Sequence, residues 1–341
     1  MTNFDNLTTI SRKETIDGLS IPGIIRNGSY YFTDIQVYSD GLIYCWDTVD
    51  LELFQQKLDK QWVVTSIPDG QYIHIHSLGQ WKIEQGQWEF TPQTYYEFVH
   101  ALVRQLNPAM ENLKSCYGST TIKKGNVNYA KFPIPNPKPY YISEPSAYSP
   151  KRASGDSFNI FFREDNEQLY LAQLSIYPDG HLSITHLPQT RSYTFPELAK
   201  LMEQQRILTE LPPGVRVHIW GLGSFVATEG DGEPATEKLK EFTNSFMVMN
   251  GAEDLVDKCR RILEDYRKNP TEQLKESLKQ AYEAIPEHER MYVGDMDVKD
   301  IEVRMIIYGE DEIRGWSHYQ VAKNRGEQLP GISIPKPKSE Q

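Results

Sequence analysis

The sequence predicts an α+β protein with two tandem copies of a strand–strand–helix–strand unit, followed by a helical C-terminal module. Each unit is expected to be an antiparallel sheet with helices on one face. Three observations predict this fold: the chain repeats itself, each copy alternates apolar and polar residues around an Asp-Gly turn, and helical spacing takes over beyond residue 250. A chain of 341 residues has room for two or three domains.

The repeat consists of two blocks that recur in the same order. Residues 31–43 (YFTDIQVYSDGLI) match residues 170–182 (YLAQLSIYPDGHL) at a constant offset of 139. Residues 67–79 match residues 211–223 at an offset of 144, which places a five-residue insertion between His186 and Tyr193. Because two ordered matches with one short gap rarely arise by chance, the sequence indicates an internal duplication.

Each copy is expected to begin with a hairpin and continue with a short helix. Asp40-Gly41 and Asp179-Gly180 separate alternating apolar runs, and glycine accepts the positive φ of a tight turn. Asp50 and Thr194 occupy equivalent positions and predict helix N-caps. Residues 194–197 (TFPE) also have the spacing of a capping box, with proline in the first turn.

A third strand and a second helix complete each unit. The third strands are expected at residues 72–77 and 215–221, and the first copy adds a candidate strand around residues 81–90. The second helices are expected to open at Thr91-Pro92 and at Glu233-Pro234.

Composition shifts divide the chain into five segments. Prolines at alternate positions favour an extended spacer between the copies, although a ligand for an aromatic groove is an alternative. Apolar stripes after residue 250 predict two antiparallel helices and further helices towards the end. The expected segments are a first α+β repeat domain (1–130), a Pro-rich linker (131–155), a second α+β repeat domain (156–250), a helical module (251–330) and a disordered tail (331–341).

Charge and cysteine content exclude several classes of function. The chain has 47 acidic and 36 basic residues, a net charge of −11, which argues against non-specific binding to nucleic acid or anionic membranes. No apolar run approaches the roughly 18 residues of a spanning helix. Cys45, Cys116 and Cys259 lack metal or redox spacing, and the N-terminus lacks a signal peptide. We therefore expect a cytoplasmic protein without membrane contact.

Three histidines are candidate metal ligands. His74 and His76 lie two residues apart on a predicted strand, so their side chains share a face and could supply two nitrogen ligands to zinc. The equivalent residues of the second copy are His218 and Trp220, so His218 is a third candidate. The alternative is a structural role on a half-buried strand.

Three aspartates form a second candidate metal site. Asp295, Asp297 and Asp300 could hold a hard cation such as Mg²⁺ or Ca²⁺. Alternatively, Asp297 or Asp300 caps the helix expected from Ile301. The glycines at 221, 223, 230 and 232 lack a phosphate-loop ending, and no nucleophile–His–Asp arrangement is visible. The sequence predicts no catalytic residue and identifies no cofactor.

A duplication without a reactive constellation favours a protein-interaction or regulatory role, with paired surfaces contacting a partner. The acidic charge suggests a basic protein partner, as for an inhibitor or immunity-type binder. Two alternatives remain: a metal-dependent hydrolase that uses these histidines or aspartates, and a small-ligand sensor with a pocket between the repeats.

Overall fold

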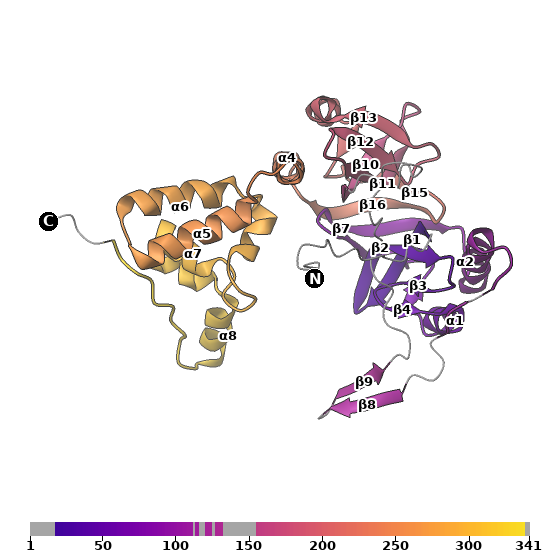
Figure 1. The fold of residues 1–341 in the computed structure, drawn as a ribbon, viewed down its shortest axis with the longest axis horizontal. Helices are drawn as coiled ribbons and strands as arrows, with labels where there is room; N and C mark the ends of the chain where they lie inside the picture. Colours follow the sequence, from indigo (N-terminus) through magenta and orange to yellow (C-terminus); the bar gives the residue numbers. More distant parts are fainter. Residues whose placement is uncertain (1–17, 112, 116–119, 125–126, 132–154, 338–341) are drawn as a thin grey trace, which may run out of the picture.

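The computed structural model describes residues 18–111, 113–115, 120–124, 127–131 and 155–337 (Figure 1). The Pro-rich linker expected at 131–155 lies outside the described residues except for its first and last positions. Strands of both repeats form one long sheet, and a helical body follows at the C-terminal end (Figure 1). The prediction of an α+β fold with two tandem units and a helical C-terminal module is confirmed.

The two repeats contain the same strands and α-helices in the same order, and the second adds a 3-10 helix, η1. The first comprises β1 (Gly18–Asn27), β2 (Ser29–Tyr38), β3 (Ile43–Tyr44), β4 (Thr48–Val49), α1 (Leu51–Asp59), β5 (Val63–Val64), β6 (Tyr72–Ile75), β7 (Gly79–Trp88) and α2 (Pro92–Leu106). The second comprises β10 (Asp156–Arg163), β11 (Leu169–Ile176), β12 (His181–Thr185), β13 (Arg191–Thr194), η1 (Phe195–Glu197), α3 (Leu198–Glu203), β14 (Ile207–Leu208), β15 (Val215–Ile219), β16 (Gly223–Gly232) and α4 (Ala235–Met249). A hairpin of β8 (Thr120–Lys124) and β9 (Val127–Lys131) lies between them.

Most of the sheet runs in the order β13-β12-β11-β15-β16-β7-β6-β2-β1-β5. The last strands of the two repeats, β7 and β16, pair antiparallel and join the two halves. Most neighbouring strands are antiparallel, but β2 pairs with β6 and β11 with β15 in parallel. The sheet of each unit is therefore mixed rather than wholly antiparallel, because the helix-containing connection between these strands is long enough for a parallel crossover.

The duplication extends to individual turns. Left-handed backbone conformations recur at the offsets found in the sequence, 139 in the first block and 144 in the second. The equivalent pairs are Gly28 and Glu167, Gly41 and Gly180, Gln61 and Gln205, Gly70 and Gly214, Ser77 and Gly221, and Gly79 and Gly223. Most of these positions are glycines, and Gln61 and Gln205 adopt the conformation although non-glycine residues rarely do. The recurrence at these offsets confirms the predicted register of the two copies.

The predicted helix starts are also present. The Asp50 carboxylate accepts a hydrogen bond from the backbone N–H of Leu53 at 2.8 Å. In the second copy, the backbone N–H of Thr194 donates to Glu197 at 2.8 Å, as in a capping box. These bonds satisfy backbone or cap groups that a helix start otherwise leaves unpaired.

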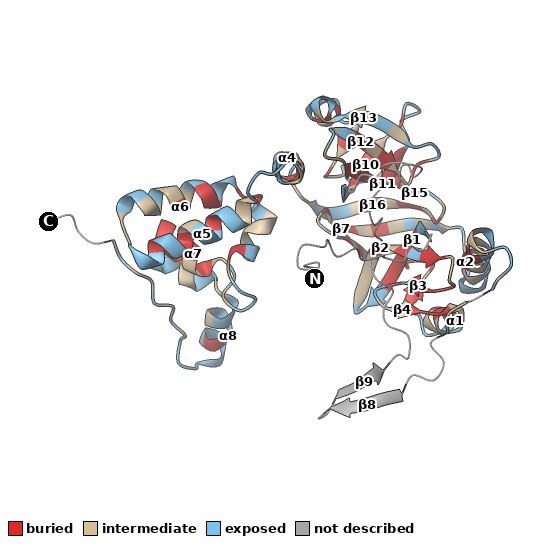
Figure 2. Cartoon of the chain, in the orientation of Figure 1, coloured by how far each residue is buried: buried red, intermediate tan, exposed pale blue. Residues whose placement is uncertain are grey.

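The core of the first repeat continues into the second. Buried residues, red in Figure 2, lie on strands of both repeats. Trp81 of β7 packs edge-on against Phe161 of β10, with 4.9 Å between ring centroids, and both belong to one apolar cluster. Because this cluster crosses the junction, the two copies are held together by a shared core as well as by strand pairing.

The helical module has a separate core. The module comprises α5 (Leu255–Lys268), α6 (Glu272–Ala284), η2 (Glu287–Val293), α7 (Ile301–Tyr308), η3 (Glu310–Gly315) and α8 (Ser317–Arg325). Its buried apolar side chains form their own cluster. At the end of the module, η3 and α8 are separate helices with Trp316 between them. Among the residues that the structure describes, no helix is long and apolar enough to cross a membrane.

Part of the expected disordered tail packs on this module. Ile334 contacts its apolar core, and the Tyr266 hydroxyl donates to the Pro335 carbonyl at 3.1 Å. Residues 331–337 therefore differ from the expectation because an apolar side chain finds a hydrophobic surface. Residues 338–341 lie outside the described part of the chain.

Candidate functional site

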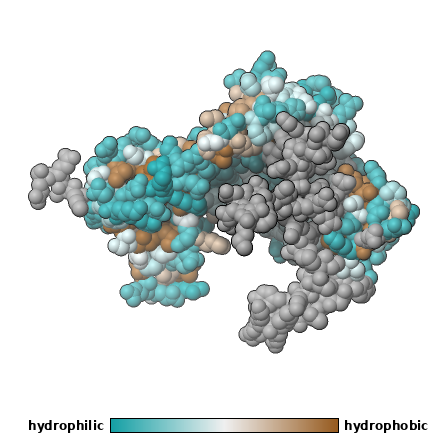
Figure 3. Space-filling model, viewed as in Figure 1, coloured by the Kyte–Doolittle hydropathy of each residue, from teal (hydrophilic) through white to brown (hydrophobic). Residues whose placement is uncertain are grey.

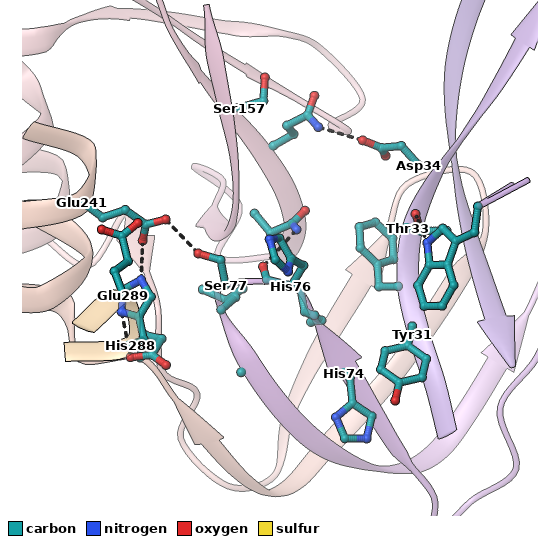
Figure 4. Close-up of a pocket in the computed structure, with 18 of the residues that line it drawn as sticks. Tyr31, Thr33, Asp34, His74, His76, Ser77, Ser157, Glu241, His288 and Glu289 are labelled. Atoms are coloured by element: carbon teal, nitrogen blue, oxygen red, sulfur yellow. Dashed lines mark hydrogen bonds and ion pairs between the residues drawn. The ribbon is translucent and has the colours of Figure 1, made fainter. Parts of the chain in front are cut away.

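A cleft of about 920 Å³ lies where the two repeats meet the helical module. The first repeat contributes β2, the β3–β4 region and the end of β6, and the second contributes β10 and β11. The third side comes from α4 and η2. Representative lining residues are Tyr31, Asp34, Trp46, His74, Ser77, Asn159, Gln173, Glu241, His288 and Glu289 (Figure 4).

Among the described residues, six ring side chains of the first repeat line this cleft. We call four of them, Tyr31, Tyr44, Trp46 and His74, the aromatic wall. Tyr31 and His74 are partners in the β2–β6 register and stack with ring centroids 5.0 Å apart. Trp46 lies 5.3 Å from Tyr31, and its indole N–H donates to the Thr33 hydroxyl at 3.2 Å.

Trp46 is unusual in both exposure and backbone conformation. Its side chain is 40% exposed, and its φ is +65°. A bulky residue in the left-handed region carries a conformational cost, and such costs concentrate at functional sites. Trp46 is therefore a strained and partly exposed member of the aromatic wall.

The structure separates the three candidate histidines. His74 and His76 both line the cleft. His218 instead contacts Tyr170, with centroids 5.3 Å apart, in the second-repeat equivalent of the Tyr31–His74 contact. Burial and the nearby Arg216 lower the pKa of His218. It is absent from the cleft lining, so the three do not converge on one ligand position.

A polar network borders the opposite side of the cleft. The Lys238 side chain on α4 is fully buried. Its ammonium contacts Glu241 and donates to the carbonyl and hydroxyl oxygens of Ser77 at 2.9 and 3.0 Å. The Ser77 hydroxyl in turn donates to the Glu241 Oε1 at 2.8 Å.

Ser77 is a second left-handed residue in the cleft, with φ of +58°, where the second repeat has Gly221. Glycine adopts this conformation without strain. The hydrogen bonds of the serine hydroxyl to Lys238 and Glu241 explain why a strained serine stands at this position in the first repeat.

His288 connects the helical module to this network. Its Nε2 lies 3.0 Å from the Glu241 Oε2, and its Nδ1 lies 3.2 Å from the Glu233 Oε2. Burial lowers the pKa of His288. The hydrogen bond and charge of Glu241, together with the charge of Glu233, raise it by a larger amount, so the net shift is upward. The imidazole ring thus links η2 to residues at and just before α4.

One group of donors in the described residues has metal-ligand spacing. The ligand atoms of Glu241, His288 and Glu289 all lie within 4.8 Å of one another. However, the Lys238 ammonium contacts the same Glu241 oxygen that faces His288. A cation bound there would meet a positive charge already in place. No sequence pattern predicts this group, because Glu241 and His288 are 47 residues apart.

The structure does not bring Asp295, Asp297 and Asp300 together as a donor group. Asp295 accepts from the backbone N–H groups of Asp297 and Val298 at 3.0 and 2.7 Å. Asp300 stands at the N-cap position of α7 without a side-chain cap bond, and its carboxylate accepts from the Tyr282 hydroxyl. These contacts organise the loop before α7.

Asp34 and Gln173 meet across the junction of the repeats. They occupy equivalent positions at the 139 offset, and the Gln173 amide donates to the Asp34 Oδ2 at 2.8 Å. The Asp34 Oδ1 lies 3.6 Å from the His186 Nε2. Burial raises the pKa of Asp34 and lowers that of His186, although the two groups partly oppose these shifts.

The described cysteines are not poised for thiolate chemistry. Cys45 and Cys259 are buried free thiols. Burial raises the pKa of Cys45 to about 11 and that of Cys259 to about 12. Both thiols are therefore protonated near neutral pH and serve as core residues.

Comparison with protein families places the repeats and the helical module in separate models. The model described as Domain of unknown function (DUF7638) matches residues 7–110 and 144–253, more than half of the chain. The chain belongs to this family. A second model, Domain of unknown function (DUF7639), matches residues 254–330. No curated protein and no solved structure matches the chain.

The cleft draws on both matched regions. The DUF7638 segments supply the aromatic wall, Asp34 and Glu241, whereas the DUF7639 segment supplies His288, Glu289 and Tyr292. The site is therefore complete only when the helical module packs against the repeats.

Proposed function

We propose that this chain is a sensor that binds a small ligand reversibly in the cleft between its repeats and its helical module. The observation that carries this proposal is the cleft itself, about 920 Å³ in volume and lined from three parts of the chain. Small-molecule sites are commonly clefts of roughly 300–1,000 Å³ at such junctions.

The chemistry of the lining supports binding rather than catalysis. No cysteine is among the described residues that line the cleft. The donor group of Glu241, His288 and Glu289 is partly neutralised by Lys238. The exposed rings of Tyr44 and Trp46 provide contact surface without reactive groups.

The contacts of η2 explain how occupancy could be sensed. Besides the His288 contacts, the backbone N–H of Glu287 donates to the Glu237 carboxylate at 2.9 Å. A ligand touching both β2 and η2 favours the docked arrangement by its differential affinity for that state. The docked position of the helical module would then signal that the cleft is occupied.

A thermal-shift screen of metabolite classes tests the proposal. One class is expected to give a saturable rise in Tm, because a ligand at 100 times its Kd stabilises the folded state by about 2.7 kcal/mol. Trp46→Ala should abolish the rise. Trp220→Ala is the matched control, because Trp220 is 49% exposed and does not line the cleft.

Two results would contradict the proposal. One is that no metabolite class gives a saturable rise in Tm. The other is a shift that survives Trp46→Ala unchanged, because binding would then occur outside the cleft.

A protein partner is a second candidate, supported by an exposed apolar segment. Met291, Tyr292 and Met296 are 40%, 53% and 95% exposed, and hydrophilic residues predominate on much of the module face seen in Figure 3. In a cytoplasmic protein of net charge −11, a basic partner fits best. Co-purification with a stoichiometric partner should be lost in Met296→Asp, and a partner retained by this variant would argue against the surface.

A further inference from the structure

The charge of the cleft narrows the class of ligand. Its described lining includes four carboxylates, Asp34, Glu233, Glu241 and Glu289, and no lysine or arginine side chain. The ammonium of Lys238 is sealed behind Glu241 with no exposed surface. His288 also lines the cleft and contacts Glu233 and Glu241, so these two carboxylates are already partly compensated. A cavity in which the remaining charge has one sign repels ligands of that sign and concentrates the opposite one. The cleft therefore selects against phosphates and carboxylates and favours cations.

The four carboxylates are not equally available. Glu241 already contacts Lys238, Ser77 and His288, and Glu233 faces His288. Glu289 differs, because its carboxylate forms no hydrogen bond or ion pair with another described residue, although it lies within 4.8 Å of Glu241 and His288. Burial and the charge of Glu241 raise its pKa. A bound cation would relieve this unfavourable arrangement.

A second incompletely compensated carboxylate lies across the cleft. Figure 4 shows Asp34 and Glu289 on opposite sides of Ser77 and His76. The amide of Gln173 donates to Asp34 but carries no charge. The nearby imidazole of His186 is 3.6 Å away, and burial lowers its pKa. Negative charge therefore remains at two separated positions.

The aromatic wall offers a surface for the apolar part of such a ligand. Tyr31 and Trp46 line the same cleft as the two carboxylates. Ring faces attract ammonium groups within about 6 Å and also cover methylene groups. The Thr33 hydrogen bond and the contact with Trp62, 6.5 Å between centroids, hold the Trp46 ring in place. The ring is thus positioned before a ligand arrives.

We infer that the ligand of this cleft is a linear di- or polyamine, bound through ammonium groups at Asp34 and Glu289, with the aromatic wall on the Asp34 side of the cleft. This inference rests on the proposed function as a small-ligand sensor. It specifies the chemistry that the two ends and the wall recognise together.

A divalent metal ion is the competing occupant at the Glu289 end. It would use Glu241, His288 and Glu289, but the Lys238 ammonium already contacts Glu241. A metal ion also makes no use of Asp34 or the aromatic wall on the other side. An organic cation uses both ends and is favoured for that reason.

Isothermal titration calorimetry of the full chain with length-matched probes tests the inference. The probes are spermidine, 1,8-diaminooctane, octylamine and 1,8-octanediol, which differ in the number of charges over a similar length. Each charge-assisted contact adds substantially to binding, so we expect the first two to bind at least about tenfold more tightly than the last two. Raising the salt concentration should weaken the diamine by screening.

Three charge-neutralising variants locate the binding. Asp34→Asn and Glu289→Gln should each weaken 1,8-diaminooctane roughly three- to tenfold, because each removes one of its two charged contacts. Glu264→Gln is the matched control, since Glu264 is exposed on α5 and outside the cleft. An unchanged Tm without ligand checks that all three variants fold.

The outcomes separate this inference from the proposed function. If octanediol or octylamine binds as tightly as the diamine, and Trp46→Ala abolishes this binding, the polyamine inference is overturned. Ligand binding in the cleft would still be supported. Diamine binding unchanged by both Asp34→Asn and Glu289→Gln would also overturn it. The inference would also be overturned if Mg²⁺ binds the wild type, displaces the diamine and no longer binds Glu289→Gln. No binding of any probe refutes the amine class, and an empty metabolite screen in addition refutes the sensor.

Discussion

Replacing Lys238 with methionine tests the role of the buried network most severely. Methionine preserves much of the stem, which lies near Phe158 and Phe242, with the ammonium 5.5 and 5.1 Å from their ring centroids. The substitution removes the charge that contacts Glu241 and leaves that carboxylate buried. Breaking a buried ion pair on one side costs about 3–5 kcal/mol.

Urea unfolding measures this cost as a lowered free energy of unfolding. Lys240→Met on the same helix is the control, because Lys240 is 42% exposed and pairs with Glu237, a surface contact worth about 0–1 kcal/mol. The double variant Lys238→Met/Glu241→Met should recover much of the loss, since replacing both partners by apolar groups is often neutral. A single-variant loss below about 1 kcal/mol would refute this reasoning.

Three further predictions concern the same cleft. The folded-state pKa of His288 is raised, so its contribution to stability should be fully present below its unfolded pKa and disappear as pH rises through the folded value. The difference in Tm between wild type and His288→Gln, measured between about pH 5.5 and 9, tests this. A difference that grows with pH would contradict it. Ser77→Ala keeps the strained φ and loses the hydroxyl bonds to Lys238 and Glu241, so chemical denaturation should show a loss of about 1–3 kcal/mol, and an unchanged midpoint would count against the network. Trp46→Gly removes the ring–cation contact, so ligand binding should fall at least about tenfold. The Tm without ligand should change little, because the substitution relieves the left-handed φ of an exposed residue. Binding equal to wild type would show that the aromatic wall is not part of the site.

Much of the fold could be predicted because the duplication preserved local signals. The Asp-Gly turns and the caps at Asp50 and Thr194 depend on neighbouring residues, so they are legible in the sequence. The first strand of each copy, β1 and β10, lies outside the matched blocks and was missed. So was β16, because its glycines resembled turn residues. The pairing of β7 with β16 depends on tertiary packing, which a sequence pattern does not encode.

The candidate site was predicted only in part. The sequence marked His74 and His76, which line the cleft, and it suggested a pocket between the repeats as an alternative. It could not associate Glu241 with His288, because these residues are far apart in sequence and meet through the packing of η2 on α4. Lys238 gave no signal because a lysine in an amphipathic helix is normally solvent-exposed.

Hydrogen–deuterium exchange of the full chain, with and without saturating 1,8-diaminooctane, tests whether the repeats and the helical module form one ligand site. If the cleft is one ligand site built from the repeats and the helical module, exchange should slow together in residues 72–79 and 287–293, and both effects should disappear in Trp46→Ala. Slowed exchange confined to one of these segments, or unchanged by Trp46→Ala, would contradict a shared site.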